Sequence, residues 1–290
     1  MRANHQPDAP GDPHTEMNGS GAAAAAAAPP KAALAEHVYQ AGFLHGQFAD
    51  VTLSVARFQE FKLHALIVST SPTLRHLLHA SHGPPYRLLL QSSDPRLTQH
   101  GLSIALASLY GQDPVSDRHD ADSSALLAAA YLLGLHELTH RTYAQMVERV
   151  TASTLPRLLH FCIGDGAPDT LDVDYVGPYP GFTDALLRHL AGFISTTLLL
   201  EHEQMFHEVL VHLPYPILKH ILESPDLQTK GDMARHQLAR SIINEREKLR
   251  KQKGGALEEV VVLAFGGGGR GSVEIIQRPA GRGKKLWKAR

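Results

Sequence analysis

Cysteine and net charge are both scarce in this chain of 290 residues. It has one cysteine, Cys162, and 28 Lys+Arg against 29 Asp+Glu. A single cysteine excludes an intramolecular disulfide and favours a reducing compartment, the cytoplasm or the nucleus. Nothing near Cys162 marks an activating base, so we expect a buried thiol and not a nucleophile. The balanced charge gives no global attraction to nucleic acid, and no nucleic-acid partner is expected.

Long apolar segments are missing as well. The longest run, Ala125 to Leu135, is far shorter than the roughly 20 residues that a membrane span needs, so no membrane partner is expected. The run Ala22 to Ala28 follows acidic residues and precedes Pro29-Pro30, which is not the pattern of a secretory signal. Residues 1–30 have no periodic apolar pattern, and we expect a disordered tail there.

Residues 31–150 mix helical and strand signals. Leu34, Val38 and Ala41 form one helical stripe, with Gly42 as a stop signal. The segments 48–55 and 60–68 form a predicted hairpin, because apolar and polar residues alternate in the first. Other expected elements are a helix over 71–80 capped by Ser71 with Pro72 at its first position, a strand over 86–91, a helix over 97–111, and a long helix or helix pair over 120–150.

Beyond Val150 the strand signals give way to helix signals. One short helical stretch covers 151–164, a loop of about 18 residues follows, and four helical segments lie between 182 and 253. Residues 151–253 are therefore predicted to be an all-α module. Residues 254–290 are rich in glycine and basic residues, and we expect a flexible tail.

Specific residues of the first module resemble the BTB/POZ domain. "GQFADVTLSV" is similar to the first-strand signature of that family, with its Asp at Asp50; "FKLHALIVSTSPTLRHLL" carries the family histidine at His64; and "LASLYG" resembles the aromatic helix end at Tyr110-Gly111. The resemblance spans residues 33 to about 150. Residues 150–253 resemble the helical BACK extension of such proteins more loosely, and the combination is most similar to fungal and germ-cell-less-type members.

The resemblance implies an α+β domain over 31–150, with helices flanked by a short-stranded sheet, followed by a BACK-like helical module over 151–253. It also implies a homodimer formed by the first helix and first strand. The residues expected in the dimer interface are Leu34, Val38, Phe43, Val51 and Leu53. The alternative for these five residues is packing within a monomer.

In function, the resemblance implies a non-enzymatic protein that dimerises and binds other proteins. The leading hypothesis is a substrate-recruiting adaptor of a cullin-RING ubiquitin ligase, whose partners are itself, a cullin scaffold and an unknown protein substrate. The alternative is a nuclear transcriptional or chromatin scaffold. A candidate nuclear-import tail contains Arg282, Lys284, Lys285, Lys288 and Arg290.

One motif points to a different class of function. His136-Glu137-x-x-His140 has the spacing that places two zinc ligands and a general base on one helix face. A catalytic site needs a third protein ligand, and the extended metzincin pattern is broken because Tyr143 and Met146 stand where glycine and histidine would be required. The helical pattern places both imidazoles toward solvent or a neighbouring helix. We therefore expect no metal and no cofactor, and zinc hydrolysis is the remote alternative.

A second motif lies near the C-terminus. Gly266-x-Gly268-x-x-Gly271 follows a strand-like apolar run and has the form of a dinucleotide-binding fingerprint. Such a site needs a helix, a second strand and an acidic residue about 20 positions further on. The remaining residues contain Pro279, Gly281 and Gly283 and leave no room for that unit. We interpret the segment as a glycine linker.

Overall fold

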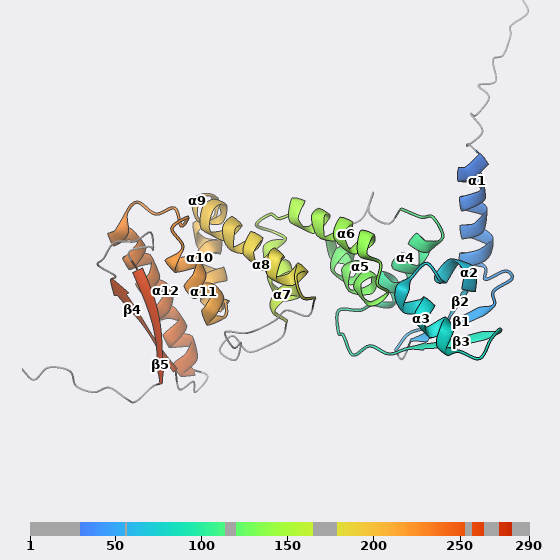
Figure 1. The fold of residues 1–290 in the computed structure, drawn as a ribbon. Coiled ribbons are helices and arrows are strands. Elements are labelled where there is room, and N and C mark those ends of the chain that lie inside the picture. Colours follow the sequence, from blue (N-terminus) through green and yellow to red (C-terminus); the bar gives the residue numbers. More distant parts are fainter. Residues whose placement is uncertain are drawn as a thin grey trace, which may run out of the picture.

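The computed structural model describes residues 30–55, 57–113, 120–164, 179–252, 257–263 and 273–279. These residues form an elongated molecule with a small sheet at one end, helices along the middle and a hairpin at the other end (Figure 1). The N-terminal domain contains α1 (Pro30–His37), the π-helical segment η1 (Val38–Leu44), β1 (Val51–Val55), β2 (Phe61–Leu63), α2 (Ala65–Val68), α3 (Pro72–Ala80), β3 (Tyr86–Leu90), α4 (Gln99–Leu109), α5 (Asp120–Leu132) and α6 (His136–Glu148).

The second part of the chain is mostly helical. It contains α7 (Leu155–Ile163), α8 (Phe182–Phe193), the π-helical segment η2 (Ile194–Leu198), α9 (Leu199–Glu201), α10 (Glu203–His212), α11 (Tyr215–Glu223), α12 (Asp232–Gln252), β4 (Leu257–Leu263) and β5 (Val273–Pro279).

The N-terminal sheet has β1 at its centre, in the order β2-β1-β3. β1 pairs antiparallel with β2 and parallel with β3, so the predicted hairpin and third strand are confirmed. The alternation predicted for β1 is also present, because Val51, Leu53 and Val55 are buried while Thr52 and Ser54 are partly exposed. The alternating pattern thus fixes which face of the strand meets the core.

The second strand is shorter than predicted. The chain leaves the strand after Leu63, and Ala65 begins the helix α2, whereas the sequence pattern predicted strand up to Val68. The cause is a side chain from outside the segment, since Asp50 Oδ1 accepts a hydrogen bond from the Ala65 backbone N–H at 2.8 Å. A carboxylate that binds a free N–H at a helix start favours the turn.

Helix α3 begins as predicted. The Ser71 hydroxyl accepts a hydrogen bond from the Leu74 N–H at 3.2 Å, and Pro72 occupies the first turn. The same hydroxyl donates to the Leu133 carbonyl at 2.6 Å, so this cap also ties α3 to the end of α5.

The predicted stop at Gly42 is wrong. The helix continues through this residue as η1 and ends at Leu44. Gly42 is buried, and a Cβ atom there would lie 3.2 Å from His64 Cε1. The glycine therefore serves close packing between η1 and His64 instead of ending the helix.

The segment over 120–150, predicted to be a long helix or a helix pair, is a helix pair. Gly134 has φ of +70° and separates α5 from α6. The middle of α5, from Ala125 to Ala130, is buried on all sides, and its residues belong to two hydrophobic clusters. Leu126 and Ala129 pack in the core of the N-terminal domain, whereas Leu127 and Ala128 pack in the core of the helical module. The two modules therefore share a helix and not merely a linker.

Polar contacts reinforce this junction. Tyr179 donates a hydrogen bond to Asp94, and Arg96 Nε donates to the Phe161 carbonyl at 2.9 Å. The Tyr179 ring stacks on Phe161, with the ring centroids 5.5 Å apart. Asp94 and Arg96 precede α4, so these contacts hold the N-terminal domain against the first helices of the second module.

The prediction of a flexible tail over 254–290 is wrong for two segments. β4 and β5 pair antiparallel, with Val261 opposite Ile275, and lie against α11 and α12. Val273 and Ile275 are buried in the core of the helical module. Glu259 is buried between Arg246, at 3.0 Å, and Arg250, at 2.6 Å. The second module is therefore helical with a closing β-hairpin, and not all-α.

No helix in the described part of the chain is long and apolar enough to cross a membrane. The expected disordered tail and the loop predicted at 164–180 lie outside the described residues, apart from Pro30, Gly164, Tyr179 and Pro180.

The packing of α4 on α5 gives a first prediction. A Cβ atom on Gly101 would lie 2.6 Å from the Ala125 carbonyl oxygen, whereas a Cβ on Gly192, which is exposed in α8, would meet nothing within 4 Å. Gly101→Ala should therefore lower the free energy of unfolding by about 1–3 kcal/mol through overpacking. Gly192→Ala should raise it by up to about 1 kcal/mol through helix propensity. Urea denaturation of both variants measures this, and equal effects would contradict the close α4–α5 contact.

Candidate functional site

Three of the four signature residues meet in one hydrogen-bond network. Asp50 binds the Ala65 N–H, as described above. The His64 backbone N–H donates to the Tyr110 hydroxyl at 3.1 Å, and His64 Nδ1 lies 3.0 Å from the same hydroxyl. His64 Nε2 lies 2.7 Å from the Gln47 carbonyl oxygen. The network joins the start of α2, the end of α4 and the segment before β1.

The positions of the hydrogens on the His64 ring and the Tyr110 hydroxyl follow from their hydrogen-bond partners. A carbonyl oxygen only accepts, so His64 Nε2 carries a hydrogen and donates to Gln47. In the neutral imidazole Nδ1 is then an acceptor, and the Tyr110 hydroxyl donates to it. Burial raises the pKa of Tyr110 to about 12, the hydrogen bond from the His64 N–H acts in the opposite direction, and the Asp50 charge raises the pKa further. Tyr110 therefore stays a neutral donor at physiological pH.

Gly111, the fourth signature residue, ends α4. It has φ of +86°, and a Cβ there would lie 3.4 Å from Ala35 Cβ of α1. Glycine is suited both to the left-handed conformation and to the close approach of α1.

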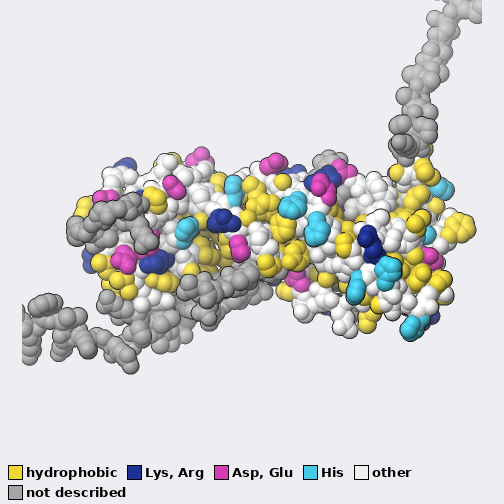
Figure 2. All heavy atoms as spheres, in the orientation of Figure 1, with side chains coloured by type: hydrophobic (Ala, Val, Ile, Leu, Met, Phe, Trp, Pro, Cys, Tyr) yellow, Lys and Arg dark blue, Asp and Glu magenta, His cyan; other side chains and the backbone are white. Residues whose placement is uncertain are grey.

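A shallow apolar groove of about 360 Å³ lies over this network. Its lining includes Val38, Ala41 and Gly42 of the η1 segment, and Asp50, His64, Ala65 and Ile67. Phe48 and Leu66 also line the groove and are 94% and 86% exposed, and Leu34, one turn earlier on α1, is 63% exposed. Figure 2 shows hydrophobic side chains gathered at this end of the molecule, at the base of α1. We call the surface formed by Leu34, Phe48 and Leu66 the N-terminal apolar face.

The five residues predicted for the dimer interface differ in exposure, and they do not all lie on one surface. Leu34 belongs to the N-terminal apolar face, and Val38 lines its groove. Phe43 is partly buried, with its ring 5.1 Å from that of Tyr110. Val51 and Leu53 are only 1% and 0% exposed, so their assignment to the interface is wrong. β1 is the central strand of its sheet, and its apolar side chains are covered by the domain's own core.

Sequence analysis missed Phe48 and Leu66. Phe48 adopts φ of +60°, which no sequence pattern of a phenylalanine predicts. Leu66 lay within the predicted second strand, over 60–68, whereas the structure places it in the short helix α2. The apolar run over 65–68 was the available signal, because a short helix exposes one member of such a run.

Comparison with known proteins agrees with this architecture. No family model matches the chain. The chain is 30% identical over 267 residues to BTB/POZ domain-containing protein 2 of Schizosaccharomyces pombe, an alignment that covers 90% of the chain and 93% of the relative. The chain belongs to the BTB/POZ domain-containing proteins. The small sheet with its surrounding helices is consistent with the BTB/POZ fold.

The zinc motif of this BTB/POZ protein lies on α6, whose first turn contains His136 and Glu137. His136, Glu137 and His140 are all exposed, and the His140 ring lies 5.0 Å from that of Phe182 in α8. No group of three His, Cys, Asp or Glu residues that could hold a metal ion occurs in the part of the chain that the structure describes. The predicted orientation toward solvent and a neighbouring helix is confirmed. The buried residues of α6, such as Leu138 and Met146, lie on other faces of the helix.

Cys162 is fully buried in α7, as expected. Burial raises the pKa of its thiol to about 12, and Arg96 only partly opposes this shift. A thiol with this pKa is neutral at physiological pH and is a poor nucleophile.

The glycine motif is followed by the wrong element for dinucleotide binding. A dinucleotide fingerprint places its glycines between a strand and a helix. Here the next element is β5, which pairs antiparallel with β4. Gly266, Gly268 and Gly271 themselves lie outside the described residues, as do the five residues of the predicted import tail.

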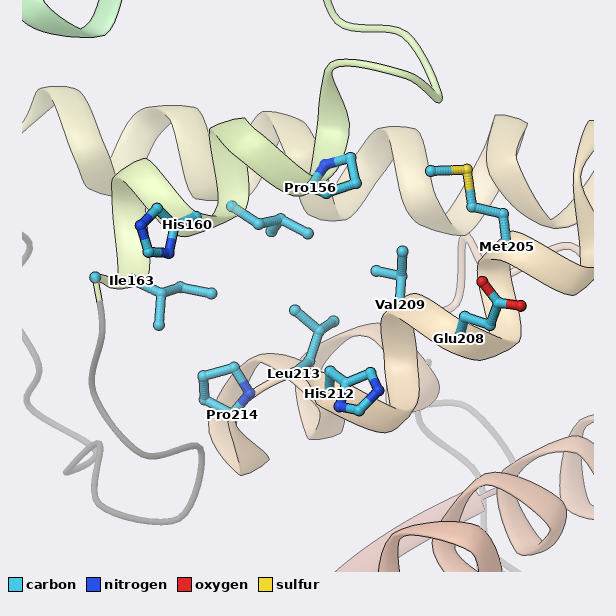
Figure 3. A pocket seen from close by; sticks show the side chains of 11 residues that line it. Pro156, His160, Ile163, Met205, Glu208, Val209, His212, Leu213 and Pro214 are labelled. Carbon is cyan, nitrogen blue, oxygen red and sulfur yellow. The ribbon is translucent and has the colours of Figure 1, made fainter. Parts of the chain in front are cut away.

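A second apolar groove, of about 400 Å³, lies in the helical module (Figure 3). Pro156, Leu159 and Ile163 of α7 form one wall, and Met205 and Val209 of α10 form the other; Leu213 and Pro214 close one end. The polar side chains that line it are His160, Glu208 and His212. We call it the α7–α10 groove. Its apolar lining suits protein side chains, and Met205 adapts its shape to different partners.

The His64–Tyr110 network gives a second prediction. Tyr110→Phe leaves the His64 backbone N–H without its acceptor, so the free energy of unfolding should fall by about 1–3 kcal/mol. Tyr39→Phe is the matched control, because Tyr39 stacks on Phe43 at 5.7 Å and no hydrogen bond of its hydroxyl is seen to another described residue. Thermal and urea unfolding measure both. Equal stabilities of the two variants would show that the network contributes nothing.

Proposed function

We propose that this BTB/POZ protein is a non-enzymatic interaction protein that forms a homodimer through the N-terminal apolar face. The supporting observation is the exposure of two large apolar side chains that line one groove, Phe48 and Leu66, together with exposed Leu34, one helical turn before Val38 of the same groove. Clustered apolar surface of this kind marks interaction sites, whereas single exposed apolar residues are ordinary.

A second copy is the occupant that the surface favours. Homodimers most often have a two-fold axis, so the same patch occurs on both sides of the interface. Each apolar patch would then cover the other. Complete burial of a Leu or Phe side chain contributes about 1.5–3 kcal/mol, and three such side chains per copy provide a substantial driving force before the entropic costs of association.

A charged residue in the N-terminal apolar face should prevent this dimer. In Leu66→Glu, dimerisation would desolvate a carboxylate on each copy, so the mass measured by light scattering should fall at least by half at a fixed micromolar concentration. Leu200→Glu is the control, because Leu200 is 64% exposed but lies on α9 in the helical module. An unchanged mass for Leu66→Glu would remove the N-terminal apolar face as the dimer interface.

We further propose that the helical module is a BACK-like extension and that the α7–α10 groove recruits a protein substrate to a cullin-RING ubiquitin ligase. The membership of the BTB/POZ family supports a protein partner. The groove supports an apolar segment of that partner as the bound element, because most of its lining residues are apolar. Glu208, the acidic residue of the groove lining, favours a Lys or Arg beside the apolar residues of the ligand.

Purified components test this role directly. The chain should form a complex with a purified cullin N-terminal domain, and this complex should survive gel filtration. The Val209→Asp variant should still form that complex, but it should no longer label the protein substrates that the wild-type chain labels in proximity labelling. The substitution places a carboxylate in the apolar wall of the α7–α10 groove without touching the N-terminal domain. Leu200→Asp is the matched surface control.

Failure to bind any cullin would contradict the ligase role and leave the dimer proposal standing. Retention of the same labelled proteins by Val209→Asp would show that the α7–α10 groove is not the recruiting surface.

A further inference from the structure

The β4–β5 hairpin has two long edges that differ in their surroundings. On the β5 edge, the Ile275 N–H donates to Glu223 Oε1 at 2.7 Å. The Ile275 carbonyl accepts from the Tyr215 hydroxyl at 2.8 Å and from Lys219 Nζ at 2.7 Å. All three side chains belong to α11. The main chain of Ile275 therefore points toward α11 and away from β4.

The orientation of the Ile275 main chain also determines which N–H and C=O groups of β4 point away from β5. Val261 is the residue opposite Ile275. In an antiparallel ladder, opposite residues either both hydrogen-bond to one another or both point their N–H and C=O groups outward. The N–H and C=O of Val261 consequently point away from β5, and so do those of Glu259 and Leu263, two residues before and after it in the strand.

In the part of the chain that the structure describes, α12 packs against β4, and the polar contacts seen there are to the side chain of Glu259. Among the described residues, none outside the hairpin is seen to hydrogen-bond to the main chain of Val261. Its ladder with β5 is continuous from Leu257 to Leu263, without a bulge. The strand also contains no proline and no lysine, the residues that commonly protect an edge from pairing. An edge of this kind is a template for another strand.

The two faces of the hairpin differ as well. Ile275 packs into the core of the helical module, and Glu259 is held by Arg246 and Arg250 of α12. The opposite face carries Val260 and Ile276, which are partly exposed, and Val262, which is 37% exposed and has the exposed Glu274 opposite it in β5. A strand added to β4 would extend an apolar strip on that face.

We propose that β4 pairs antiparallel with β4 of a second copy of this chain, about a two-fold axis at Val261. A two-fold axis between antiparallel strands can pass through a hydrogen-bonded or a non-hydrogen-bonded pair. An axis at Val260 sets Glu258 opposite Val262 of the other copy, and an axis at Val262 leaves Glu259 without a partner in the strand. An axis at Glu259 brings two carboxylates to adjacent positions, and an axis at Leu263 leaves Glu259 and Val261 without partners in the strand. The axis at Val261 pairs Glu259 with Leu263 of the second copy and pairs Val261 with itself.

The side chains fit the same register. Val260 of one copy then lies opposite Val262 of the other on the exposed face, so apolar residues meet across the junction and no like charges do. The result is a continuous four-stranded sheet in the order β5-β4-β4-β5. This contact is separate from the N-terminal apolar face and lies at the opposite end of the chain (Figure 1).

Proline at position 261 tests the pairing. Val261→Pro removes an N–H that points away from β5, so the hairpin keeps its own ladder, since proline is tolerated on an edge strand with its nitrogen facing outward. In full-length chain that carries Leu66→Glu, light scattering at increasing concentration should show dimers, and adding Val261→Pro should leave monomers with a melting temperature near that of the parent. A mass that Val261→Pro does not change overturns the proposal.

A cysteine cross-link provides a second measurement if Val261→Pro perturbs folding. Val260→Cys combined with Val262→Cys places thiols opposite each other across the two-fold axis, and the native Cys162 is buried. Mild oxidation of the full-length chain should give a disulfide-linked dimer on non-reducing gels. Val260→Cys alone should give at least several-fold less. Equal cross-linking of the single and double variants, or none in either, contradicts this register.

Discussion

The hydrogen bonds of His64, which are part-buried toward Tyr110, are the constraint on which the interaction surface depends. His64 is connected to Tyr110 through both its backbone and its ring, and its other ring nitrogen is bonded to Gln47. Asp50 binds the next residue in the chain and so begins α2 where the strand would otherwise continue. A partly satisfied buried network is costly, so these groups hold their geometry together. Leu66 and Phe48 are exposed as a consequence of that geometry.

Continuity between the two modules is the second feature of the architecture. α5 contributes to both hydrophobic clusters, and Tyr179 and Arg96 link the segment before α4 to the helical module. A chain built in this way places its N-terminal apolar face and its α7–α10 groove on one continuous body. This arrangement is suited to a protein that binds one partner at each surface, because the distance between the partners is then determined by the fold and not by a linker.

Local patterns predicted the elements whose causes are local. The alternation over 51–55 and the Ser71-Pro72 cap specify a strand and a helix start by themselves, and both are present. Elements with distant causes could not be predicted in this way. The hairpin β4–β5 depends on Arg246 and Arg250, which bind Glu259 from another helix, while its glycine-rich neighbourhood suggested a flexible tail. Alternation in β1 identified its apolar residues but did not show that the same domain covers them, so Val51 and Leu53 were assigned to the interface.

The central claim is that a second copy covers the N-terminal apolar face, and hydroxyl-radical footprinting of the wild-type chain tests it most directly. Phe48 and Leu66 are highly exposed in the single chain, Leu200 provides an exposed reference, and Phe206 provides a buried one. The account predicts that Phe48 and Leu66 are protected nearly as well as Phe206 at high protein concentration and become reactive on dilution, while Leu200 does not change. Reactivity of Phe48 and Leu66 equal to that of Leu200 at every concentration would contradict it.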